Sequence, residues 1–120
     1  MAIFISKLLN DKHPIINGNG KQTRDYIYVD DVVNANMLAM KKNVIGIYNI
    51  GTAKETNVNQ LFKKITGLMK FKAVQIHGPA LVGEQMRSCL DIRKINKVGF
   101  KINYNLEQGL KETINWFNHI

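Results

Sequence analysis

The sequence predicts a single small domain of the mixed α/β class that spans residues 1–120. Three observations support this fold class. The chain of 120 residues has 45% apolar residues with only 2 prolines and 9 glycines, which is a globular composition. Short β-branched runs alternate with segments whose apolar residues recur at every third or fourth position. No repeat, low-complexity tract or change of composition marks a linker.

The first third of the chain reads as a helix and two strands. Residues 2–9 are predicted to form a short helix, and residues 14–16 a short strand that enters the glycine turn at 17–20. Aromatic and β-branched residues alternate over residues 26–29, and this alternation predicts a second strand.

The next segment predicts an amphipathic helix that ends near residues 43–46. Asp30 or Asp31 is placed to cap its first turn, since a carboxylate can accept from the free amides there. Its apolar stripe is expected to face the core and consists of Val33, Met37 and Met40.

The middle of the chain predicts two further strands on either side of a strong helix. The apolar run 47–50 reads as a buried strand that Gly51 ends, and residues 73–77 read as another strand before a loop at 78–88. Asn57 is placed to cap the helix between them, whose core face consists of Val58, Leu61, Phe62, Ile65 and Leu68.

The last segments are helical. Asp91 is expected to cap a short helix that continues to Lys97. Asn105 with Gln108 three residues later has the spacing of a capping box, and it predicts a final helix that buries Leu106, Leu110, Ile114 and Phe117.

The charge of the chain does not indicate a nucleic-acid-binding protein. The formal net charge is +8, and Lys and Arg contacts to phosphates dominate nucleic-acid affinity. The basic residues, however, occur only as short pairs on predicted helices with an apolar opposite face, so a solvated surface explains them. We therefore expect no nucleic-acid partner.

The cysteine and hydropathy patterns indicate a cytoplasmic protein. Cys89 is the only cysteine, so no internal disulfide can form, and we expect an inert buried thiol. No His and Cys residues have metal-ligand spacing, and no run is long enough for a signal peptide or a membrane span. We expect neither a metal nor a membrane partner.

Arg24 is the best candidate for a functional residue. The chain has no dinucleotide-binding glycine motif, no Tyr-x-x-x-Lys pair, no phosphate loop of the Walker type and no nucleophile elbow. A guanidinium beside a glycine turn can bind a phosphate with two parallel hydrogen bonds. The alternative, weighted equally on local sequence, is a surface ion pair that neutralises Asp25 and Asp30.

Four blocks of sequence resemble a known family. They are GNGKQTRDYIYVDD at residues 18–31, YNIG at 48–51, GEQMRSCLD at 83–91, and LEQGLKETINWF at 106–117. In order and spacing they resemble the C-terminal part of NAD-dependent nucleotide-sugar epimerases and dehydratases, which are extended short-chain dehydrogenases of the UDP-glucose 4-epimerase type. The resemblance covers nearly all of the chain.

The resemblance implies a substrate-binding lobe that lacks the N-terminal Rossmann half. In the family that half carries NAD and the Tyr-x-x-x-Lys pair, so no catalytic or cofactor-binding residue is expected here, and the chain alone should not bind NAD. The nucleotide of a UDP-sugar would be held by four residues. Arg24 would bind its phosphate, Tyr26 would lie beside Arg24, Glu84 would accept from a ribose hydroxyl, and Ser88 would line the same wall.

Three positions depart from the family pattern. Asn17 stands where an aromatic residue is usual, and Ala53 stands where a glycine often follows Gly-Thr. Leu81 replaces an arginine that contacts the diphosphate in the family, and a leucine cannot supply that cation. The departures predict weaker nucleotide binding or a different substrate.

Three functions remain open on the sequence. The first is a substrate-binding lobe that is inactive alone. The second is a subunit of a split epimerase, which a separate Rossmann-domain chain completes. The third is a vestigial fold that binds a partner protein. Because the lobe normally packs against a larger domain, we also expect the isolated chain to self-associate. Which sugar, nucleotide and family reaction apply is left open.

Overall fold

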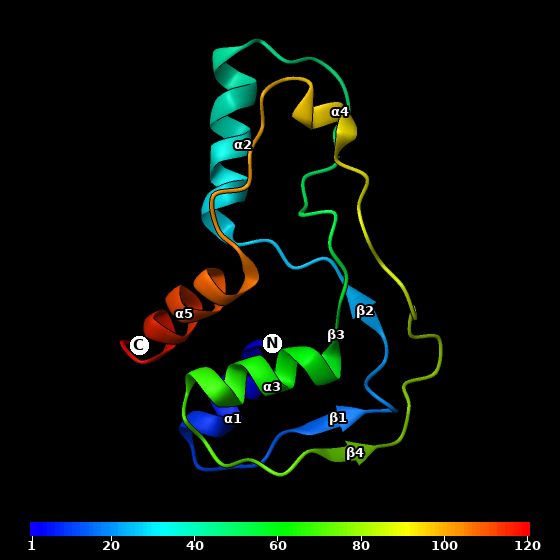
Figure 1. Ribbon diagram of the computed structural model, residues 1–120, viewed down its shortest axis with the longest axis vertical. Coiled ribbons are helices and arrows are strands. Elements are labelled where there is room, and N and C mark those ends of the chain that lie inside the picture. The colour runs from blue at the N-terminus through cyan, green and yellow to red at the C-terminus, as the bar shows by residue number, and fades with distance from the viewer.

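The computed structural model describes all residues, 1–120. Figure 1 shows α1, α3, α5, β1 and β4 at one end of the molecule and α2 and α4 at the other. The molecule is a flat plate of 47 × 35 × 18 Å. The elements in chain order are α1 (Ala2–Leu9), β1 (Ile15–Asn17), β2 (Thr23–Arg24), α2 (Val29–Lys41), β3 (Thr56–Asn57), α3 (Val58–Leu68), β4 (Ile76–Gly78), α4 (Arg93–Asn96) and α5 (Leu106–Phe117).

The larger of two cores lies between α1, α3 and α5. Capping boxes begin both α3 and α5, through Asn57 with Gln60 and Asn105 with Gln108. Each box satisfies amides that have no partner within the helix, so these two predicted helix starts are confirmed. The predicted helix at residues 2–9 is also confirmed. The buried residues of this core are Phe4, Ile5, Leu8, Ile16, Leu61, Phe62, Ile65, Leu110 and Ile114.

The smaller core lies between α2 and α4 and contains Ala35, Ile92, Ile95 and Phe100. Extended chain segments connect it to the larger core (Figure 1). With only 19 of 120 residues buried, the two cores leave much of the chain exposed.

Two short strand pairs complete the fold. β1 and β4 are parallel, with Ile16 opposite His77, and β2 and β3 are antiparallel, with Arg24 opposite Thr56. The strand predicted at 14–16 is found one residue later. The strand predicted at 73–77 is shorter than expected, since only Ile76–Gly78 has a partner.

The strand predicted at residues 26–29 is wrong. β2 ends at Arg24 and α2 begins at Val29, and no strand lies beside the residues between them. The alternation has another cause: Tyr26 packs against the larger core, whereas Ile27 packs against the smaller one. Two cores on opposite sides of an extended chain produce the same period of two as the faces of a sheet.

The predicted start and core face of α2 are also wrong. The residue that precedes the helix is Tyr28, and no side chain caps it. Asp30 and Asp31 lie in the first turn, where their negative charge still favours the helix dipole. The stripe Val33, Met37 and Met40 points to solvent, and the buried residues of the helix are Asp31 and Ala35.

Three further expectations need correction. Residues 47–50 form no strand because no other strand lies beside them, and Ile47 is 88% exposed.

Asp91 does not cap a helix. It accepts from the backbone amide of Arg93 and forms an ion pair with that side chain, and α4 begins after Ile92. Cys89 is exposed, although partial desolvation raises the pKa of its thiol.

The mixed α/β fold class is confirmed, with five helices and four short strands. None of the helices combines the length and the apolar character that crossing a bilayer requires.

Candidate functional site

Arg24 lies on β2 between the glycine turn and the loop that follows β4. The turn is possible because Gly18 and Gly20 have φ of 64° and 70°, which is the left-handed region that glycine tolerates best. On the open edge of β2, the amide of Thr23 donates to the carbonyl of Met86 at 2.9 Å. The loop at 81–88 is thereby held against Arg24.

The guanidinium of Arg24 and the carboxylate of Glu84 face each other across this contact. Nη2 of Arg24 lies 3.7 Å from Oε1 of Glu84, and the side chains are 32% and 24% exposed. Nη1 donates to the carbonyls of Thr23 and Gln85, both at 2.7 Å. Because one nitrogen is fixed and the ion pair is long, the outer edge of the guanidinium keeps donors for a ligand.

Gln22 joins the pair from the other side and is a residue that the sequence analysis missed. Its side chain is almost completely buried, and Nε2 donates to the carbonyl of Asn17 at 3.0 Å and to Oε2 of Glu84 at 3.3 Å. It orients the Glu84 carboxylate toward Arg24. Its place directly before β2 and two residues before Arg24 is the signal that could have identified it.

Tyr26 is close enough to the ion pair for both of its charges to act on the phenol. Burial raises the pKa of its phenol, the positive charge of Arg24 opposes that effect, and the negative charge of Glu84 adds to it. The phenol is therefore protonated at neutral pH and can donate a hydrogen bond. Of the four predicted site residues, the structure brings Arg24 and Glu84 into contact, and the charges of both act on Tyr26.

Ser88 is not joined to this group. It is half-buried on the same loop as Glu84, but its hydroxyl has no hydrogen-bond partner among the other three residues.

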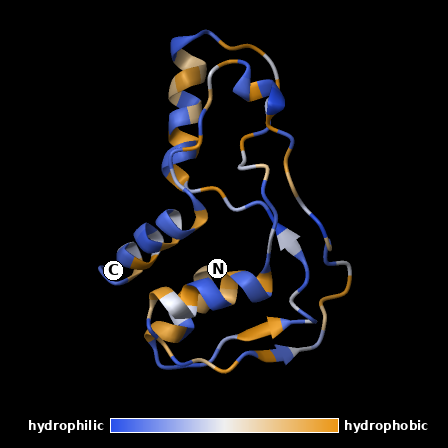
Figure 2. Cartoon of the chain, viewed as in Figure 1, coloured by the Kyte–Doolittle hydropathy of each residue, from blue (hydrophilic) through white to orange (hydrophobic).

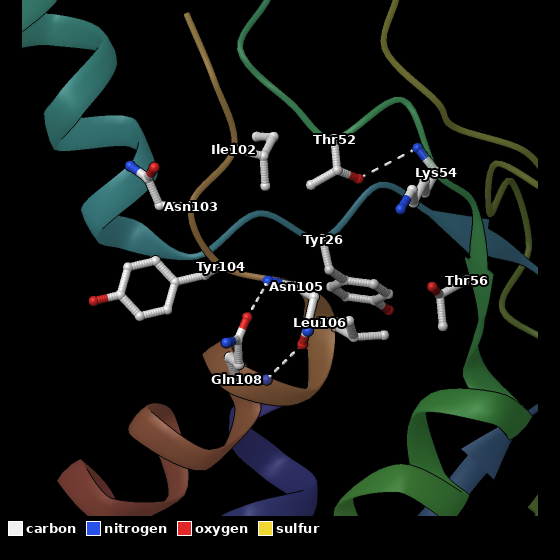
Figure 3. Close-up of a pocket in the computed structure, with 10 residues that line it drawn as sticks. All are labelled: Tyr26, Thr52, Lys54, Thr56, Ile102, Asn103, Tyr104, Asn105, Leu106 and Gln108. Carbon is white, nitrogen blue, oxygen red and sulfur yellow. Dashed lines mark hydrogen bonds between the residues drawn. The ribbon is translucent and has the colours of Figure 1, made fainter.

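A cleft of about 400 Å³ extends from Tyr26 toward the start of α5. Figure 3 shows the Tyr26 ring between Thr52, Lys54 and Thr56 on one side and Leu106 on the other. The cleft mixes apolar contacts with hydroxyls, amides and one ammonium group, as small-molecule sites commonly do. The full lining is Tyr26, Thr52, Lys54, Thr56, residues 102–106 and Gln108.

Asp25 does not pair with Arg24. Its carboxylate accepts from the hydroxyl and the amide of Thr52, the latter at 2.9 Å, and from the amide of Ala53 at 3.0 Å. The amide of Leu90 donates to it more weakly, at 3.4 Å. The alternative of a surface ion pair of Arg24 with Asp25 and Asp30 is therefore wrong, because the partner of Arg24 is Glu84.

The structure shows the backbone conformation or the surroundings of two of the three residues that depart from the family pattern. Ala53 has φ of 57°, a left-handed conformation in which glycine is unstrained and alanine is not. Leu81 is 57% exposed at a turn where its carbonyl accepts from the amide of Glu84 at 3.3 Å. A longer, charged side chain at position 81 therefore has open space.

Known proteins similar to this chain are nucleotide-sugar epimerases and dehydratases. The model of the NAD dependent epimerase/dehydratase family matches residues 1–51. A Methanocaldococcus jannaschii protein assigned as a UDP-glucose 4-epimerase is 43% identical over 120 residues, which are 99% of this chain and 39% of that protein. Human dTDP-D-glucose 4,6-dehydratase is 34% identical over 122 residues, which are 95% of this chain and 35% of that protein.

Solved structures agree with these sequence matches. UDP-glucose 4-epimerase of Thermotoga maritima, crystallised with UDP-glucose, superposes with a TM-score of 0.91 at 38% identity over 98% of this chain and 38% of that one. UDP-N-acetylglucosamine 4-epimerase of Methanobrevibacter ruminantium, in complex with UDP-N-acetylmuramic acid, gives a TM-score of 0.92 at 32% identity with the same coverage. The chain spans less than two fifths of each solved relative. In sequence and in fold, it matches the C-terminal part of an NAD-dependent nucleotide-sugar epimerase/dehydratase of the extended short-chain dehydrogenase family.

Proposed function

We propose that this chain is the nucleotide-sugar-binding part of a UDP-glucose 4-epimerase-like NAD-dependent epimerase/dehydratase and that it is inactive alone. The observation that carries the proposal is the Arg24–Glu84 pair. Its guanidinium and carboxylate lie 3.7 Å apart with part of each side chain exposed.

The pair suits a nucleoside diphosphate. The outer edge of the Arg24 guanidinium supplies donors in the planar geometry that phosphate oxygens accept. The Glu84 carboxylate accepts hydrogen bonds, which a ribose hydroxyl can donate. Because the ion pair is long, a phosphate can take over Nη2 without breaking a short contact. Ser88 would line the outer wall of this site.

NAD does not fit the residues of this chain. A dinucleotide pyrophosphate sits on a helix N-terminus that directly follows a glycine turn. Here the turn at Gly18 and Gly20 leads into strand β2 instead. Hydride transfer would require the rest of the enzyme, and the chain alone is expected to give no saturable NAD isotherm in calorimetry.

A second candidate follows from the length of the relatives. Since this chain covers 38% to 39% of several of them, a separate chain could supply an NAD-binding half and form a split epimerase. A partner with a dinucleotide-binding glycine motif and a Tyr-x-x-x-Lys pair, recovered by co-purification, would support that candidate. An unrelated partner would support a vestigial interaction domain instead.

Titration of UDP tests the nucleotide site. We expect the wild-type chain to bind UDP and Arg24→Ala to weaken binding by roughly 10- to 100-fold, the equivalent of one charge-assisted hydrogen bond. Leu81→Arg should strengthen it by a similar factor. Arg93→Ala, which removes an equally charged but 86% exposed arginine paired with Asp91, is the matched control and should bind as the wild type does.

Two results would contradict the site. If the wild type and Arg24→Ala bind UDP equally, Arg24 is not a phosphate ligand. If no variant binds, Leu81→Arg included, this surface is not a nucleotide site. Circular dichroism of each variant shows whether it is folded.

A further inference from the structure

The turn between β1 and β2 contains the only two Asn-Gly pairs of the chain, Asn17-Gly18 and Asn19-Gly20. The turn is hydrophilic (Figure 2), and both asparagines are exposed. Asparagine is a thermally labile residue. The backbone nitrogen of the next residue can attack its side-chain amide carbon, and glycine, which has no Cβ, permits the closest approach. Both pairs are therefore candidates for the same intramolecular reaction.

The fold blocks the attacking nitrogen of the first pair. The amide of Gly18 donates to the carbonyls of Gly78 and Pro79, at 3.0 and 3.2 Å. The carbonyl of Asn17 accepts from Nε2 of Gln22 at 3.0 Å, so both polar atoms of this peptide group are paired. The Gly18 nitrogen would have to give up its hydrogen bonds before it could attack, and this raises the barrier to the reaction.

The attacking nitrogen of the second pair is free. The carbonyl of Asn19 accepts from Nδ2 of Asn59 at 2.9 Å, but the amide of Gly20 donates to no group of the chain. An amide without a partner is uncommon in a folded protein. Attack by this nitrogen breaks no hydrogen bond.

The side chain of Asn19 is also held in a favourable position. Its Oδ1 accepts from the backbone amide of Lys21 at 2.9 Å. This hydrogen bond closes the side chain over the Gly20 peptide, as in an Asx turn. Attack on the side-chain carbon places negative charge on Oδ1, and a donor that already points at this oxygen stabilises that charge. The amide of Lys21 therefore favours the reaction at Asn19.

We propose that Asn19 is a site of spontaneous deamidation and that the fold protects Asn17. The nitrogen of Gly20 bonds to Cγ of Asn19, and the side-chain nitrogen leaves as ammonia, which takes up the proton of the Gly20 amide. The product is a cyclic succinimide. Water then opens this ring at one of its two carbonyl carbons, and no other reactant is required.

The two products of ring opening should affect the turn differently. Opening at Cγ gives aspartate, whose carboxylate can still accept from the amide of Lys21. Opening at the main-chain carbonyl gives isoaspartate, in which the main chain runs through Cγ and is longer. The turn has no room for a longer chain, because a Cβ at Gly20 would lie 1.9 Å from Oδ1 of Asn59. Isoaspartate should therefore loosen the contact between the turn and α3.

Mass spectrometry of the full chain after incubation at mildly alkaline pH tests the proposal. Trypsin releases residues 13–21 as one peptide that contains both asparagines, and fragmentation shows which of them has become a carboxylic acid. We expect Asn19 to react at least about tenfold faster than Asn17, the equivalent of one hydrogen bond at Gly18. A sample digested without incubation corrects for reaction during digestion.

The unfolded chain is the control for the role of the fold. In concentrated urea the hydrogen bonds of Gly18 and of Lys21 are lost, and both asparagines are simply followed by glycine. Their rates should then become similar.

Two matched variants isolate the site. Asn19→Gln should remove most of the acidic species that ion-exchange chromatography separates, because a glutamine would have to close a larger ring. Asn17→Gln makes the same change at the protected position and should form the acidic species at the wild-type rate. After separation, the isoaspartate form should melt at a lower temperature than Asn19→Asp, which reproduces the other product.

The proposal is overturned if Asn17 reacts as fast as Asn19 in the folded chain. It is also overturned if the preference for Asn19 persists in urea, or if neither asparagine reacts in the folded chain while both react in urea. None of these measurements uses UDP, so their outcome does not depend on the nucleotide site.

Discussion

The carboxylate of Asp31 accepts a hydrogen bond from the backbone amide of Asn103, 2.9 Å away and 72 residues later in the chain. The next amide, of Tyr104, donates to the same carboxylate at 3.1 Å. Asp31 is completely buried and connects the start of α2 to the segment that leads into α5. It therefore joins α2, which contributes to the smaller core, to α5, which contributes to the larger core.

Replacing Asp31 should destabilise the whole chain. Asp31→Asn keeps the shape but places an amide donor against two backbone donors, and we expect it to lower the free energy of unfolding by about 1–3 kcal/mol. Asp30→Asn, one residue earlier and exposed, is the control. It loses only the favourable interaction with the helix dipole, so it should lower the free energy of unfolding by less. Urea denaturation measures both.

The same experiment tests whether residues 1–120 are one domain. Because Asp31 links the two cores, Trp116 fluorescence and circular dichroism should follow the same transition. Two separate transitions in the wild type would mean that the cores unfold independently.

Removing the Asp25 carboxylate should loosen the loop after residue 50. Asp25→Ala leaves the amides of Thr52 and Ala53 without their acceptor, and the loss of a charged hydrogen bond lowers stability by about 1.5–3 kcal/mol. Hydrogen exchange should become faster at these two amides while Ile65, in the larger core, keeps its protection relative to global unfolding. Unchanged exchange at Thr52 and Ala53 would show that another group holds the loop.

Restoring glycine at position 53 should stabilise the chain. Ala53 has φ of 57°, and relieving the Cβ strain outweighs the added flexibility of glycine by about 0.5–1 kcal/mol. Lys72→Gly is the control, because Lys72 is exposed and has no left-handed φ, and it should not stabilise. A thermal midpoint that does not rise for Ala53→Gly would contradict the strain.

The ion pair of Glu55 and Arg87 should make stability sensitive to acid. Hydrogen bonds from Arg87 and Thr23 lower the pKa of Glu55 to about 2 from its ordinary 4.5. Because the pKa in the folded state is depressed, the stabilisation is present above pH 4.5 and is lost as the pH falls toward 2. The two side chains are at the surface, so salt should reduce the effect.

Urea midpoints measured across this pH range provide the test. In Glu55→Gln, the loss of stability at low pH that comes from this ion pair should be absent. In Arg87→Met, that loss should be smaller. The double variant should behave as Glu55→Gln does. A wild-type profile that Glu55→Gln leaves unchanged would assign the acid sensitivity to other carboxylates.

The helices of the larger core show how much of the fold local sequence could predict. Asn57 and Asn105 each accept from an amide three residues later, and the apolar stripes that follow have helical spacing. All of this information lies within one or two helical turns, so it could be read without knowledge of the rest of the chain.

The failed strand predictions show where local patterns stop being sufficient. Tyr26 and Ile27 alternate because the chain passes between two cores there, and residues 47–50 are apolar but have no strand beside them. A strand forms only where a second strand supplies hydrogen bonds. The sequence of one segment does not show whether such a partner strand is present.

The local sequence was enough to predict the family resemblance and the helices that their own caps and periodicity specify, and it leaves Arg24 as the leading candidate for a site residue. Only the tertiary structure decided that Arg24 faces Glu84 and not Asp25, that Asp31 is buried beneath Asn103, and that the apolar face of α2 is exposed. The physical reason is the range of the interactions. Helix hydrogen bonds and caps close within a few residues. The partners of the Glu84 and Asp31 carboxylates are 62 and 72 residues away, and only packing brings them near.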